Sequence, residues 1–86
     1  MRESISRAEL HRRFSEALAA DATGGTFVFE IDVKEPGPDG CNWYPLASIQ
    51  HWTGDLMANL ALFRTVRAEM ERAYEVEESA AVNATS

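Results

Sequence analysis

The sequence contains a single cysteine, Cys41, so no disulfide can form within the chain. Small secreted domains commonly depend on several disulfides, and that class is therefore excluded. Uninterrupted apolar runs stay well short of the roughly 18 residues that a membrane-spanning helix needs. The N-terminal residues also lack the apolar stretch of a secretion signal. We therefore expect a cytoplasmic protein that does not contact membranes.

Basic residues are scarce: the chain has 8 of them against 14 acidic residues, which gives a net charge of −6 at pH 7. Nucleic-acid backbones are recognised by basic surfaces, so we expect no nucleic-acid partner. Lys34 is the one lysine, and the other basic residues are arginines. This preference for arginine, together with abundant alanine, indicates a GC-rich bacterial genome.

Motifs that carry chemistry are also missing. The glycines match neither a phosphate loop nor a dinucleotide fingerprint. The one candidate metal-binding cluster is Cys41, His51 and Asp55, in which His51 and Asp55 are four residues apart, whereas zinc usually takes three or four ligands in closely spaced pairs. We expect no cofactor, no metal and no catalytic residue, and therefore a protein that is not an enzyme.

The composition, 45% hydrophobic and 26% charged, is typical of one folded domain. The first element is a helix over 6–22. Its start is marked by a capping box, in which the Ser6 hydroxyl accepts from the Glu9 amide and the Glu9 carboxylate reaches back. One face of this helix is apolar. The residues on that face are Leu10, Phe14, Ala17 and Leu18.

Residues 26–34 alternate apolar and polar side chains, which predicts a strand with one buried face. The stretch 35–40 has two prolines and two glycines and must be a loop. Residues 41–44 have the composition of a short return strand, which Pro45 is expected to end because proline cannot donate to the ladder. Together these segments predict an antiparallel β-hairpin.

The last element is a long helix, placed at 48–76, with Ser48 or Thr53 as its N-cap. Its polar face includes Asn59. Its apolar stripe consists of Leu56, Leu60, Phe63, Val66, Met70 and Ala73. The fold class is thus a small α+β domain of order α-β-β-α over 1–78, in which the hairpin packs on two helices. Residues 79–86 are expected to form a flexible tail.

Such a helix would span roughly 40 Å, whereas a domain of this size measures only about 30 Å across. It would protrude from a monomer, and a second apolar patch (Trp52, Met57 and Ala61) would lie off its main stripe. Both points favour a homodimer, built on this helix or on the hairpin edges.

Aromatic residues gather beside polar donors between Asn42 and Trp52, a combination favoured at interfaces and ligand pockets. The alternative is that the two tryptophans only fill the core. If this segment binds, the contact residues are expected to be Asp39, Asn42, Tyr44, His51 and Trp52.

The leading functional hypothesis is a small non-enzymatic protein–protein interaction module, acting as a homodimer or as a subunit or adaptor of a larger protein. One alternative is a small-molecule or metal-binding domain centred on His51 and Cys41. Another is an acidic, antitoxin-like regulator that neutralises a basic partner by charge.

Overall fold

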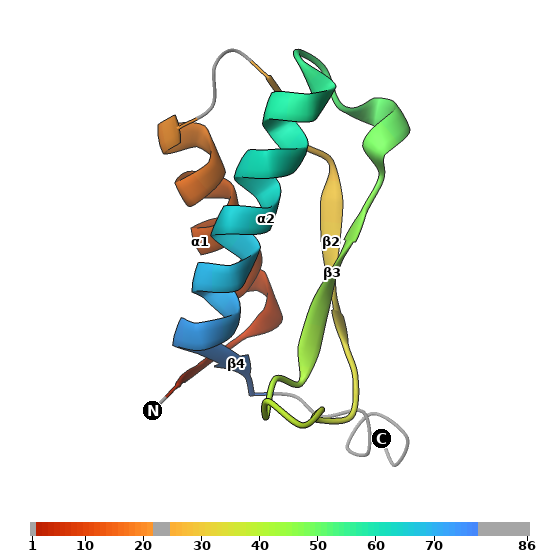
Figure 1. The fold of residues 1–86 in the computed structure, drawn as a ribbon. Helices are drawn as coiled ribbons and strands as arrows, with labels where there is room; N and C mark the ends of the chain where they lie inside the picture. The colour runs from red at the N-terminus through yellow and green to blue at the C-terminus, as the bar shows by residue number, and fades with distance from the viewer. Residues whose placement is uncertain (1, 22–24, 78–86) are drawn as a thin grey trace.

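The computed structural model describes residues 2–21 and 25–77, and it confirms the predicted α+β class. Two helices lie side by side and cover one face of an antiparallel hairpin (Figure 1). The expected tail, 79–86, lies outside the described residues. In chain order the elements are β1 (Glu3–Ile5), α1 (Arg7–Asp21), β2 (Phe29–Val33), β3 (Trp43–Ala47), the 3-10 turn η1 (Ile49–His51), α2 (Leu56–Ala73) and β4 (Tyr74–Val76).

The core lies between the helices and the inner face of the hairpin. Phe14 of α1 packs against Phe29 of β2 and Phe63 of α2, with ring centroids 4.8 and 5.0 Å apart. Trp43 of β3 is fully buried beside them and meets Phe14 edge-on. The alternation predicted for 26–34 therefore puts the expected side chains into the core, although the strand itself is shorter.

The start of α1 follows the capping prediction in part. The Glu9 amide donates to the Ser6 hydroxyl at 3.1 Å, as expected. The Glu9 carboxylate, however, accepts hydrogen bonds from Arg12 and Arg13, one turn further along the helix. These bonds from Arg12 and Arg13 lower the pKa of Glu9 from 4.5 to about 2.

Pro45 does not end the return strand, which was predicted at 41–44 and is found at Trp43–Ala47. Pro45 pairs with Ile31. The amides of Lys34 and Ser48 donate to the carbonyls of Asn42 and Val28, so the hydrogen-bonded pairs of this ladder involve even-numbered residues. Pro45 falls between them, in a position that needs no amide hydrogen on the β2 side, and it is buried.

The single helix predicted at 48–76 is wrong at both ends. Gly54 adopts a φ of +91°, which interrupts any helix begun at Ser48. Asp55 is the true N-cap, since its side chain accepts from the amides of Met57 and Ala58. With 18 residues, α2 measures about 27 Å, less than the 41 Å long dimension of the molecule, so it does not protrude.

Asn59 was predicted on the polar face of α2 but is buried, and its amide donates to the Thr53 carbonyl at 2.8 Å. This bond satisfies a backbone oxygen of the turn before the helix. Leu56, placed on the apolar stripe by its spacing, is 45% exposed instead. Phe63 and Val66 of the same stripe are buried as predicted, so the error concerns the first turn of α2 and not its inward face as a whole.

A short parallel pair, β1 with β4, joins the two ends of the described chain, with Ile5 opposite Val76. Asn42 ties the hairpin to this pair. Its side-chain amide donates to the Val76 carbonyl at 2.9 Å and its oxygen accepts from the Val76 amide at 3.0 Å. Trp43 adds a bond from its indole to the Tyr74 carbonyl. The Asn42 side chain thus acts as one more strand residue beside β4.

Replacing Asn42 with alanine should lower the free energy of unfolding by about 3 kcal/mol, because both backbone groups of the buried Val76 lose their partner. Urea denaturation measures this loss. Gln50→Ala, at an exposed position of η1, is the matched control and should change stability little. A loss below about 1 kcal/mol in the Asn42 variant would show that the two hydrogen bonds between Asn42 and Val76 do not stabilise the fold.

The ion pairs of Glu9 should make the free energy of unfolding depend on pH in the acidic range. A lowered pKa means that this contribution is complete above pH 4.5 and is lost as the pH falls through about 2. Glu9→Gln should flatten the dependence of unfolding free energy on pH in that window, as measured by denaturation at several pH values. Identical profiles for the two proteins would refute the pairing.

Candidate functional site

The structure spreads the predicted binding residues along the hairpin instead of gathering them in one place. Asp39 and Asn42 belong to the loop between β2 and β3, whereas His51 and Trp52 follow β3 at its other end. Asp39 accepts a hydrogen bond from the Cys41 amide at 3.1 Å, which lowers the pKa of Asp39. Asn42 is occupied with Val76. Asp39 and Asn42 therefore stabilise the loop and its contact with β4, and their polar groups already have partners within the protein.

Tyr44 lies midway along β3, on the face of the hairpin turned away from the core. Its hydroxyl donates to the carboxylate of Asp32, directly opposite on β2, at 3.1 Å. That hydrogen bond to Asp32 raises the pKa of Tyr44. Tyr44 and Asp32 thus mark a polar outer surface of the hairpin.

Trp52 closes the other end of the core. Its ring packs against Phe27 and Phe63, with centroids 4.9 and 5.1 Å away, and its indole donates to the Val28 carbonyl at 2.9 Å. The side chain remains half-buried, while the neighbouring His51 is exposed. Trp52 therefore packs against the core, as the core-filling alternative predicted, and a binding role for its exposed part stays a prediction.

Cys41 and His51 are held apart, because one precedes β3 and the other follows it (Figure 1). Cys41 is buried, its thiol donates to the Trp43 carbonyl at 3.3 Å, and burial raises the pKa of the Cys41 thiol. Within residues 2–21 and 25–77 no three or more histidine, cysteine or carboxylate side chains come close enough to hold a metal ion.

Exposed apolar side chains occur at the same end of the molecule as Trp52. Among the described residues, four exposed large hydrophobic side chains come from three elements: the start of the hairpin, η1 and the first turn of α2. These elements lie together at the top of Figure 1. We call this surface the apolar end. It consists of Val28, Ile49, Leu56 and Met57, of which Met57 is 75% exposed.

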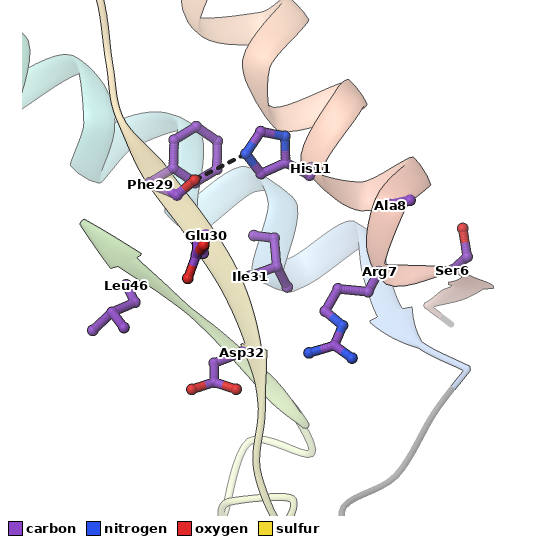
Figure 2. Close-up of a pocket in the computed structure, with 9 residues that line it drawn as sticks. All are labelled: Ser6, Arg7, Ala8, His11, Phe29, Glu30, Ile31, Asp32 and Leu46. Carbon is purple, nitrogen blue, oxygen red and sulfur yellow. Dashed lines mark hydrogen bonds between the residues drawn. The ribbon is translucent and has the colours of Figure 1, made fainter. Parts of the chain in front are cut away.

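A cleft of about 790 Å³ opens between the first turns of α1 and the hairpin. Figure 2 shows Arg7 reaching from α1 towards β2, with Glu30 and Asp32 on the far side of the strand. His11 stacks on the Phe29 ring, with centroids 4.4 Å apart, and donates to the Phe29 carbonyl at 2.9 Å. The remaining lining residues are Ser6, Ala8, Ile31 and Leu46.

The sequence pointed to Trp52 but not to this cleft. The residues that line the cleft come from three separate segments of the chain, and the pattern of Glu30 and Asp32 is that of the ordinary solvent face of a strand. The one available signal was His11, a histidine one turn after the helix start. Its ring position depends on how α1 meets β2, which the sequence pattern does not state.

Comparisons with protein-family models, with curated proteins and with solved structures found no match to this chain. In the part of the chain that the structure describes, no helix combines the length and apolar character needed to cross a bilayer. The apolar end and the cleft are therefore the surfaces from which a function can be inferred.

Cys41 should resist thiol reagents in the folded protein, because its side chain is buried and the pKa of its thiol is raised. Labelling with a chromogenic disulfide should be slow in buffer and fast in denaturing urea. Rapid labelling of the folded protein would contradict the structural role and revive the thiol as a reactive group.

Proposed function

We propose that the protein is a small non-enzymatic protein–protein interaction module that forms a homodimer through its apolar end. The supporting observation is that four exposed large hydrophobic side chains belong to the end of the molecule that also holds the half-buried Trp52. Exposed apolar residues around an aromatic side chain are typical of protein interfaces. The α2 helix itself does not support a dimer, because at 18 residues it is too short to protrude.

Charge favours a second copy as the occupant of this end. Asp55 is the sole residue with a formal charge between Cys41 and Phe63, in a chain with a net charge of −6. Two copies repel each other over most of their surface, and a segment almost without charge is where they can approach at least cost. A C2 arrangement would place the same residues on both sides.

The alternative of a ligand or metal site centred on His51 and Cys41 has weaker support. The two side chains lie at opposite ends of β3, and the thiol already donates to a backbone carbonyl. A binding role for His51 would need partners from the apolar end or from a second molecule.

Met57→Glu should weaken self-association at least tenfold, because it places an acidic side chain in an apolar contact between two acidic copies. Sedimentation velocity over a micromolar concentration range measures the effect. Thr65→Glu is the matched control, since it adds the same charge at an exposed position two turns along α2. The proposal fails if the native protein sediments as a monomer throughout, or if both variants behave alike.

A further inference from the structure

The two outer edges of the hairpin differ in their capacity to pair with another strand. On β3, Pro45 has no amide hydrogen to offer and the Trp43 carbonyl accepts from the Cys41 thiol. Proline on an edge strand is a common device against unwanted pairing. The outer edge of β3 is therefore protected.

The outer edge of β2 faces the cleft and is only partly occupied. Because the even-numbered residues pair with β3, the amide and carbonyl of Ile31 point to the opposite side, as the Phe29 carbonyl does in its bond to His11. The amide of Val33 is taken by the neighbouring Asp32 carboxylate at 3.1 Å. Ile31 has no backbone or side-chain hydrogen bond on this side within the described residues.

The edge of β2 at Ile31 opens into the cleft. A paired strand would lie about 4.8 Å from β2, between β2 and the α1 wall formed by Ser6, Arg7 and Ala8. The volume of about 790 Å³ falls within the range of binding pockets for ligands. Addition of an extended segment to a free sheet edge is a recurring mode of recognition, in which backbone bonds supply affinity and side chains supply specificity.

A second copy of this chain is a poor occupant of that edge. In an antiparallel pairing centred on Ile31, Glu30 of each copy would face Asp32 of the other. Two like-charge pairs directly across strands are destabilising, and both copies also carry a net charge of −6. The same carboxylates attract a strand with basic side chains at those positions.

We infer that the outer edge of β2 binds an extended segment of another protein, with basic residues two positions apart and an uncharged residue between them. The basic side chains meet Glu30 and Asp32 on the outer surface. The residue between them points into the cleft, on the same face as the Ile31 side chain, where an uncharged side chain is favoured. Its backbone pairs with Ile31. This site is separate from the apolar end, so either proposal can fail without the other.

The test uses the full chain and an acetylated seven-residue peptide of alternating lysine and valine, with binding followed by calorimetry. The Glu30→Lys/Asp32→Lys protein should bind it at least tenfold more weakly. Glu69→Lys/Glu77→Lys changes the net charge equally at exposed positions and is the matched control. A peptide with one N-methylated central valine should also lose at least tenfold, because it cannot donate to the strand edge.

Three results would overturn the inference. One is equal binding of a glutamate–valine peptide, and another is equal binding of the N-methylated peptide, which would indicate simple charge attraction. The third concerns Glu30→Lys alone. If a second copy occupied the edge, this change would turn two repulsive pairs into attractive ones and strengthen self-association. We expect it instead to weaken peptide binding and to leave the sedimentation of the protein unchanged.

Discussion

Proline has no amide hydrogen, and at Pro45 this fact fixes the arrangement of the whole hairpin. Pro45 is compatible with the ladder only between two hydrogen-bonded pairs, where it lies opposite Ile31. That position turns the backbone groups of Ile31 away from β3 and towards α1. The odd-numbered side chains of both strands, including Phe29 and Trp43, point into the core. The protected edge of β3 and the open edge of β2 therefore follow from Pro45, whereas the buried face follows from the alternation of apolar and polar side chains.

The surface of the molecule has two parts that differ in charge. The outer face of the hairpin carries the carboxylates of Glu30 and Asp32, and the latter also accepts from Tyr44. The apolar end carries almost no charge, with Asp55 committed to capping α2. The proposed contact with a second copy and the proposed basic partner would therefore use different surfaces and would not compete.

The sequence predicted those features of the fold that depend only on the spacing of neighbouring residues. The Ser6 cap and the alternation that buries Phe29 and Ile31 follow from spacing alone, and both are found. The β1–β4 pair was missed because two segments of three residues carry no periodicity of their own. Their pairing depends on long-range contacts, above all the bonds of Asn42 to Val76.

The errors at α2 and at the site have a similar origin. Composition alone cannot show that Gly54 takes a positive φ or that Asn59 turns inward to serve the Thr53 carbonyl. Among the predicted contact residues, Trp52 and His51 lie at or beside the apolar end. Asp39 instead accepts a hydrogen bond within the loop between β2 and β3, and Asn42 bonds to Val76 of β4. The cleft went unnoticed because its walls meet only after α1 and β2 have packed.

The central claim is that β2 has one paired edge and one open edge, and amide hydrogen exchange measured by NMR tests it most directly. The amides of Glu30 and Asp32 point to β3, so they should exchange slowly. The Ile31 amide between them should exchange much faster, and should become protected when the lysine–valine peptide is added. Equal protection of all three amides in the free protein would show that the edge is already covered, and would contradict the account.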